Sequence, residues 1–190
     1  MVLSQIVISG FETPSFKNEW RFVEGNGGNI NGTSISFPTA YSMTRTLSSI
    51  PNEFEACFFE VLVIKGFKDA EKSRILLIGF NTKDTRIPGI DRNTAAYVSK
   101  DGNGSIRQDG EILKEVEGIS QGDTIRCNLE FIRICGQTIT CYTFFKNGKV
   151  ISARRYITSN NVYPTIMVNG EGLEVETTFG TIKNNFEEGM

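Results

Sequence analysis

Glycine-containing turn signals recur at short intervals along this chain, and they leave little room for helices. They stand in EGNGGNING (24–32), KDGNGS (100–105), QDGE (108–111), EGISQGD (117–123), CGQT (135–138), KNGK (146–149) and VNGEG (168–172). No segment of about a dozen residues has the apolar period of an amphipathic helix. The segment KDAEKSR (68–74) favours a helix locally, but it is too short to count as one. This spacing predicts an all-β fold.

The clearest strand lies between two of these turns. In DTIRCNLEF (123–131), the side chains of Ile125, Cys127, Leu129 and Phe131 share one face, and polar residues occupy the other. This alternation is typical of a half-buried antiparallel strand. The apolar parity changes directly after Phe131, which predicts a bulge or a bend there.

Other segments complete a sandwich. LEVETTF (173–179) alternates in the same way, whereas CFFEVLVI (57–64) and ILLIGF (75–80) are apolar on both faces, as expected for central strands. The remaining predicted strands are WRFVEG (20–25), TSISF (33–37), AAYVS (95–99), ITCYTFFK (139–146) and YPTIMV (163–168). These short strands joined by polar turns predict a β-sandwich of two antiparallel sheets.

The stretch KNGK (146–149) could serve as an anion site or as the corner of a hairpin. The pair Asn147-Gly148 supplies the two positive-φ residues of a type I′ turn, a strong hairpin signal. A phosphate site requires a glycine-rich loop that leads into a helix, and no helix is predicted after this stretch. We therefore interpret it as a corner, where Lys146 and Lys149 keep the strand ends soluble.

Length, charge and hydrophobic pattern indicate which classes of partner and which cellular compartment to expect. The chain has 190 residues, a length typical of one domain, and a net charge of −2, so no basic excess indicates nucleic acid. No apolar run reaches the roughly 20 residues of a membrane helix. The amino end, MVLSQIVISGFE (1–12), lacks the features of a signal peptide, so a cytoplasmic protein is expected.

Residue types argue against metal binding. The four cysteines show no CxxC spacing and the chain has no histidine, so no zinc site is expected. The cysteines are instead expected to be reduced, buried thiols. DGNGSIRQD (101–109) superficially resembles an EF-hand loop, but Ile106 and Ile112 stand where glycine and glutamate are required. Neither a metal nor a cofactor is predicted.

The same residue types argue against an enzyme. Without histidine, Ser-His and Cys-His nucleophilic pairs are excluded. A glycosidase needs two carboxylates facing each other across a cleft, whereas the clusters at 53–60 and 171–176 show no inward-pointing acid pair. The only tryptophan, Trp20, is expected in the core rather than in a ligand platform.

The order of the predicted strands and turns resembles the SPRY (B30.2) domain family. The motifs are FFEVLVI, ILLIGF, PG (88–89), AAYVSKDG, QDGE, QGDTIRCNLEF, TFFKNGK and VYPTIMVNGEGLEVETTFG, and they span residues 54 to 180. The resemblance implies a bent, concanavalin-like jelly-roll sandwich. It makes residues 1–190 one domain with a core at about 54–180 and an amino-terminal extension or edge strands at 1–53.

The resemblance also implies a function. Members of this family are non-catalytic modules that bind a peptide or protein partner through loops at one end of the sandwich. Many are substrate receptors of ubiquitin ligases, and others are structural subunits of large assemblies, so both roles stay open. Carbohydrate binding is a weaker alternative that follows from the sandwich shape alone.

The chain departs from the family pattern at the positions that bind peptides in some members. Ile90 follows Pro-Gly where many members have tryptophan, and Ala95 replaces the first residue of an aromatic pair. Pro38 and Ala40 match a Pro-x-Ala element, but the turn at 169–171 lacks the tryptophan that accompanies it.

The predicted partner site lies in the connections that folding explains least. These are NTKDTRIPGIDRNTA (81–95), FPTAYSMTRT (37–46) and RRYITSNNV (154–162), which contain arginine, tyrosine or both, residue types enriched at interface hot spots. The resemblance gathers them near one end of the sandwich, together with the turn at 169–170. The predicted partner-binding residues are Arg86, Arg92, Tyr97, Tyr41, Arg155, Asn169 and Gly170.

Overall fold

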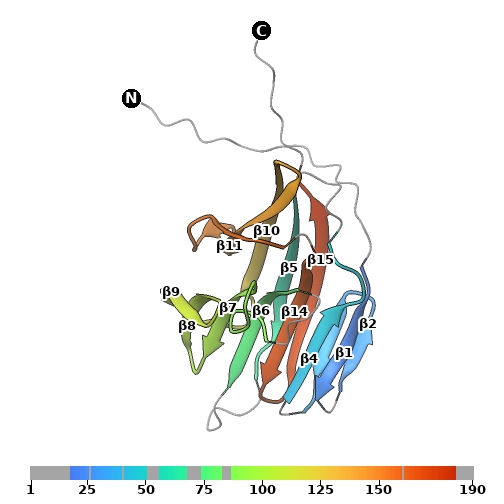
Figure 1. The fold of residues 1–190 in the computed structure, drawn as a ribbon. Helices are drawn as coiled ribbons and strands as arrows, with labels where there is room; N and C mark the ends of the chain where they lie inside the picture. The colour runs from blue at the N-terminus through green and yellow to red at the C-terminus, as the bar shows by residue number, and fades with distance from the viewer. Residues whose placement is uncertain are drawn as a thin grey trace, which may run out of the picture.

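The computed structural model describes residues 18–25, 27–39, 41–50, 56–67, 74–82, 87–159 and 161–182, which form two antiparallel sheets (Figure 1). The seven-stranded sheet, here called sheet A, contains in spatial order β1 (Trp20–Gly25), β4 (Tyr41–Thr46), β14 (Tyr163–Asn169), β6 (Ile75–Asn81), β7 (Ala95–Lys100), β8 (Asn103–Gln108) and β9 (Glu111–Glu117). The eight-stranded sheet, called sheet B, contains β12 (Lys149–Val150), β11 (Gln137–Lys146), β10 (Thr124–Ile134), β5 (Ala56–Lys65), β15 (Leu173–Thr181), β3 (Ser34–Phe37) and β2 (Asn29–Asn31), with β13 (Arg155–Ile157) paired to β11. The predicted all-β sandwich is confirmed.

The core lies between the two sheets. Ile125, Cys127 and Leu129 of β10 are fully buried, as their alternation predicts. Trp20 of sheet A is also a core residue, and its Nε1 donates a hydrogen bond of 2.9 Å to Oγ1 of Thr177 in sheet B. The strands β5 and β6, predicted as central from their two apolar faces, lie in the middle of their sheets.

No bulge interrupts β10 after Phe131, so the prediction of a bulge is wrong. The pairing of β10 with β11 continues without a register shift as far as Ile134 and Gln137. Beyond Glu130, β10 pairs with β11 alone within the described part of the chain. The apolar parity changes because the strand extends past the region where sheet A covers it, and Ile134 is 51% exposed.

The strand β4 falls in a segment predicted as a loop. Its inward side chains are Ser42, Thr44 and Thr46, which are fully buried although they are polar, so the usual apolar alternation is missing. The hydroxyls bond to backbone carbonyls: Ser42 donates to the carbonyl of Gly27 at 3.0 Å, and Thr46 donates to that of Ser48 at 2.8 Å. Buried hydroxyls that bond to backbone carbonyls thus replace apolar side chains on the inward face of this strand.

The four cysteines are free. Cys57, Cys127 and Cys141 lie buried in strands, as predicted, whereas Cys135 is exposed in the turn between β10 and β11. Burial raises the pKa of Cys57 to about 12 and also raises the pKa of Cys127.

The corner at Asn147-Gly148 has the predicted geometry. Both residues have positive φ, 50° and 76°, as a type I′ turn requires. The prediction for the flanking lysines holds for Lys149, which is exposed, but not for Lys146, whose side chain is only 13% exposed.

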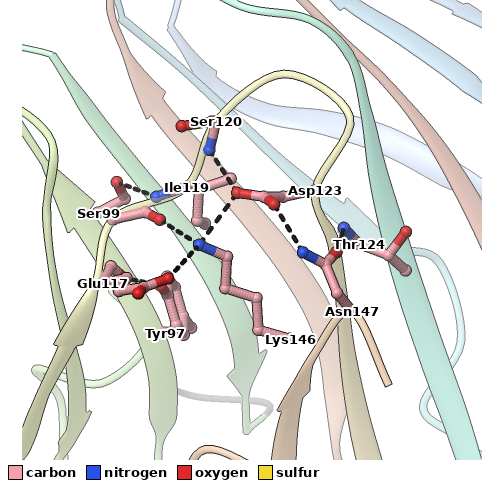
Figure 2. Close-up of polar contacts among 10 residues, drawn as sticks. Tyr97, Ser99, Glu117, Ile119, Ser120, Asp123, Thr124, Lys146 and Asn147 are labelled. Atoms are coloured by element: carbon pink, nitrogen blue, oxygen red, sulfur yellow. Dashed lines mark hydrogen bonds and ion pairs between the residues drawn. The ribbon is translucent and has the colours of Figure 1, made fainter. Parts of the chain in front are cut away.

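Lys146 takes part in a polar cluster that joins the two sheets, here called the clasp (Figure 2). Its Nζ donates to the carbonyl of Gly118 at 2.7 Å and lies 3.1 Å from Oδ2 of Asp123. Asn147 donates from Nδ2 to Oδ1 of Asp123 at 2.8 Å and accepts the amide of Thr124 at 2.8 Å. The clasp therefore fixes the connection from β9 in sheet A to β10 in sheet B. We call this end of the sandwich the clasp end.

Candidate binding groove

A row of outward side chains crosses the outer face of sheet A. Met167 on β14 lies opposite Leu77 on β6, which lies opposite Val98 on β7, and the row continues through Ser105 on β8 to Glu115 on β9. Directly opposed side chains on one face of an antiparallel pair are close neighbours. The register therefore builds one continuous strip from residues far apart in the sequence.

The middle of this strip is apolar. Met43, Leu77 and Met167 form a small buried cluster that is separate from the core between the sheets. Partly buried apolar residues pack around it: Val23, Tyr41, Ile75, Ile87 and Val98. Sheet A therefore carries apolar side chains on both of its faces.

A groove of about 600 Å³ lies over this strip. Its apolar lining comes from Ile75, Leu77, Ile90, Val98, Ile112, Val116 and Met167, and its polar lining from Lys100, Asp101, Asn103, Gly104, Ser105, Arg107 and Glu115. Apolar side chains of β14, β6 and β7 form the floor, whereas β8 and β9 contribute both polar and apolar residues. A concave apolar floor with a few convergent polar groups is the usual composition of a ligand site.

The loop 87–94 forms one wall of the groove. The amide of Gly110 donates to the carbonyl of Gly89 at 3.0 Å, which ties the loop to the turn between β8 and β9. Gly89 has a φ of 74° and lies against β7, where an added Cβ would stand 3.0 Å from Cβ of Ala96. Oγ1 of Thr94 donates to the carbonyl of Asp91 at 2.6 Å. This bonding places Ile90, 45% exposed, at the rim.

The charges around the groove differ in how they are paired. Asp101 accepts the amide of Arg74 at 2.8 Å and belongs to a turn. Arg107 is half-buried, and Nε donates to Oγ of Ser105 at 3.4 Å. Among the described residues, no carboxylate lies within ion-pair distance of Arg107 or Lys100, and no cation lies within ion-pair distance of Glu115. The groove therefore holds charges that partners outside the domain can bind.

Two of the residues predicted to bind a partner, Tyr41 and Asn169, lie beside the groove. They face each other across β4 and β14, and Asn169 lies opposite Ile75 of the groove floor. The hydroxyl of Tyr41 donates to Oε2 of Glu24 at 3.2 Å. Burial, with the negative charge and the hydrogen bond of Glu24, raises the pKa of Tyr41.

Gly170 follows Asn169 in the turn at the clasp end. Its φ of 145° favours glycine, and an added Cβ would stand 2.6 Å from the ring of Phe67. The backbone angle and the packing against Phe67 thus explain why glycine occupies position 170, independently of any partner.

Arg92 and Arg155 lie at the opposite end of the sandwich. Arg92 is exposed in the loop 87–94, and its neighbour Asn93 accepts a hydrogen bond of 3.3 Å from Oγ1 of Thr158, just after β13. Arg155 begins β13 in sheet B and is exposed. The seven residues of β14 separate the two ends, a span of roughly 20 Å at the usual rise of a strand. The expectation that all these residues gather at one end is wrong, because antiparallel strands place consecutive connections at alternate ends.

Two predicted residues remain, Arg86 and Tyr97. Arg86 lies outside the described residues. Tyr97 has no exposed area, and its hydroxyl donates to the carbonyl of Glu117. Burial, with the charges of Asp123 and Glu117, raises the pKa of Tyr97. A partner cannot touch this side chain, so we correct its assignment from a contact residue to a core residue that fixes the end of β9 (Figure 2).

The groove residues Leu77, Val98, Met167 and Arg107 were not predicted from the sequence. One signal was present, because ILLIGF (75–80) is apolar on both faces. The second apolar face was interpreted as part of the buried middle of a sandwich, whereas it forms the floor of an open groove. Only the pairing of β6 with β14 and β7 places these residues together.

Within the described ranges, no group of three or more cysteine, aspartate or glutamate side chains is arranged to hold a metal ion. In the same part of the chain, no helix is long and apolar enough to cross a membrane.

Solved structures with a similar architecture include SPRY domains and a carbohydrate recognition domain. A human SPRY domain matches with a TM-score of 0.59 and 16% identity, covering 84% of this chain and 96% of its own. The SPRY domain of human HERC1 matches with a TM-score of 0.55 and 14% identity, covering 81% and 92%. The carbohydrate recognition domain of Emp46p in its metal-free form matches with a TM-score of 0.55 and 10% identity, covering 86% and 89%. No protein-family model and no curated protein sequence matches the chain. At these low identities, the TM-scores show a shared fold and nothing beyond it.

Proposed function

We propose that this chain, which has the fold of SPRY domains, is a non-catalytic protein-interaction module that binds an extended segment of a partner protein in the groove of sheet A. The observation that carries the proposal is the apolar row of Met167, Leu77 and Val98 under an open groove of about 600 Å³. SPRY domains commonly mediate protein interactions, which supports a protein partner.

The size and lining of the groove support a peptide segment. Apolar surface that faces an open groove favours a partner that removes it from water. The polar residues around the floor, such as Asn103 and Ser105, offer hydrogen bonds that orient a backbone. An extended chain presents alternate side chains on one face, so it can place apolar groups on the floor and polar groups at the rim.

The lining is less suited to a carbohydrate. The structural neighbour from Emp46p is a carbohydrate recognition domain by its name. The lining of the groove, as far as the structure describes it, contains no aromatic ring on which a sugar could stack. Trp20 is buried in the core between the sheets, so it cannot serve as a stacking platform. A protein segment is therefore the partner we favour.

The cellular role of such a module follows from its partner. A substrate receptor of a ubiquitin ligase and a structural subunit of a large assembly use the same groove in different ways. Affinity purification followed by quantitative mass spectrometry separates them. A receptor brings down ligase subunits at substoichiometric amounts, whereas an assembly subunit co-purifies with its neighbours at fixed stoichiometry.

The groove itself is tested with short random peptides displayed on phage and selected on the full chain. We expect the selected peptides to lose about tenfold or more in affinity, about 1.4 kcal/mol, with either Val98→Arg or Ser105→Arg. Both residues line the groove, and the second substitution fills it without removing an apolar contact of the floor. Val150→Arg is the matched control, because Val150 is 63% exposed on sheet B.

Each variant is first checked by circular dichroism and urea unfolding, so that lost binding is not lost folding. Equal affinity for the wild type and for Ser105→Arg would overturn the proposal. Failure to select any peptide whose binding depends on the groove would overturn it as well.

A further inference from the structure

The side chain of Arg107 is held in place inside the groove without a counter-charge. The ladder between β8 and β9 shifts its register between Ile106 and Arg107, where Arg107 lies opposite Ile112. The unmatched residue of this bulge is Leu113 on β9, so β8 keeps its alternation and Arg107 lies on the same face as Ser105. On the other side, Gly89 of the loop 87–94 lies against the stem, since an added Cβ there would stand 3.2 Å from Cβ of Arg107.

The guanidinium has unused hydrogen-bonding capacity. It carries five N–H donors, and its only hydrogen bond within the described part of the chain is the one of 3.4 Å to Ser105. A half-buried arginine elsewhere in this protein is paired: Nε of Arg126 lies 2.7 Å from Oε2 of Glu60. A positioned cation that lacks a carboxylate, next to apolar surface, favours an anionic partner more strongly than a cation in free water does.

We propose that the groove selects a segment that carries an aspartate or glutamate on the same face as an apolar side chain, and that Arg107 binds this carboxylate. The inference rests on the proposed function, and it names Arg107 as the residue that determines specificity. The apolar side chain of the partner packs on Leu77, Val98 and Met167.

The spacing between the two contacts follows from the sheet. Ser105 lies opposite Val98, and Arg107 is two residues further along β8 on the same face. That distance is roughly 7 Å, the separation of alternate residues in an extended chain. A segment parallel or antiparallel to β8 therefore places its apolar residue and its acid two positions apart.

The negative charge of Glu115 further restricts where the carboxylate of the partner can bind. Glu115 faces Ser105 from β9 and is exposed, with no cation of the described residues within ion-pair distance. It repels a carboxylate placed on the β9 side of Arg107, which leaves the side toward Val98. The pair thus fixes where along the groove the acid binds.

The experiment uses the same phage-displayed random peptides on the wild type and on Arg107→Glu. We expect the wild-type peptides to be enriched in an acid two positions from an apolar residue. On Arg107→Glu, the enriched charge should change to lysine or arginine while the apolar residue is retained. Arg133→Glu is the matched control, since Arg133 is exposed on β10 in sheet B and makes the same change of charge outside the groove.

Affinities of one selected peptide give a second measurement. Replacing its acid by the corresponding amide should weaken binding to the wild type about tenfold, about 1.4 kcal/mol. The same replacement should have little effect on Arg107→Gln, because the two changes remove the same contact. Arg107→Gln also serves if the charge reversal fails to fold.

The outcomes separate the two proposals. Peptides whose binding is abolished by Ser105→Arg but which show no acid preference, or keep it on Arg107→Glu, would refute the role of Arg107 and leave the groove as a binding site. Peptides that bind equally well to Ser105→Arg would refute the groove and, with it, this inference. An acid preference that reverses only on Arg107→Glu supports both.

Discussion

Replacing Lys146 by alanine tests whether the clasp stabilises the fold. The side chains of Lys146 and Asp123 are 13% and 14% exposed, so their ion pair is neither fully buried nor a surface pair. Exposed pairs contribute about 0 to 1 kcal/mol, and breaking a buried pair costs about 3 to 5 kcal/mol. In Lys146→Ala the carbonyl of Gly118 also loses its donor. We expect the free energy of unfolding to fall by about 2 kcal/mol, between these limits.

Lys149→Ala is the internal control. It removes the same charge from the other side of the same turn, but Lys149 is exposed and makes no ion pair among the described residues. Its effect should stay below about 0.5 kcal/mol. Urea unfolding at neutral pH measures both variants, and an unchanged m-value shows that the denatured states are comparable. For a chain of 190 residues, about 2 kcal/mol corresponds to a fall in Tm of about 4 to 8 °C.

The pH dependence gives a check on the mechanism. Burial alone raises the pKa of Asp123, but the hydrogen bonds from Asn147, Ser120 and Lys146, with the charge of Lys146, outweigh it and lower the pKa. A lowered carboxyl pKa gives stability that is complete above the unfolded value of about 4 and is lost as the pH falls through the folded value.

The stability difference between the wild type and Lys146→Ala should therefore shrink below about pH 4, as Asp123 becomes protonated. If Lys146→Ala loses no more stability than Lys149→Ala, or if the difference grows in acid, the interpretation of the clasp is wrong.

Two further predictions follow from buried side chains. Tyr97→Phe removes the hydroxyl that donates to the carbonyl of Glu117, so it should lower the free energy of unfolding by about 1 kcal/mol in a urea titration. It should leave the affinity of the selected peptides unchanged, and a lost affinity at unchanged stability would return Tyr97 to the binding site. A maleimide added to the native chain should modify Cys135 rapidly and the three buried thiols slowly, and mass spectrometry after denaturation should count four. Rapid modification of a second cysteine without unfolding would contradict the burial of the other three.

Local sequence determined the class of the fold and many of its strands. The segment WRFVEG is β1 with the predicted bounds, and the alternation of 123–131 defines the buried face of β10. The pair Asn147-Gly148 determines the type of the turn in which it lies. The order of the motifs was sufficient for the resemblance to SPRY domains, which the structure confirms at the level of the fold. Each of these features depends on a period or on a turn within a few residues, so the sequence states it directly.

Local patterns were insufficient where polar groups find distant partners. The strand β4 was predicted as a loop, because its buried inward residues carry hydroxyls instead of apolar side chains. Lys146 looked like a solvated lysine, because its partners at Gly118 and Asp123 lie more than twenty positions away in the sequence. In both cases the environment of a side chain depends on contacts that its neighbours in the chain do not reveal.

The candidate site depends almost entirely on the tertiary structure. Of the residues predicted to bind a partner, Tyr41 and Asn169 lie beside the groove, whereas Arg155 belongs to the other sheet. The floor itself requires Met167, Leu77 and Val98 to meet across three strands. The sequence shows which face of one strand a residue occupies, because successive side chains alternate. Only the pairing of strands far apart in the chain decides which faces combine and whether the surface they form is buried or open to a partner.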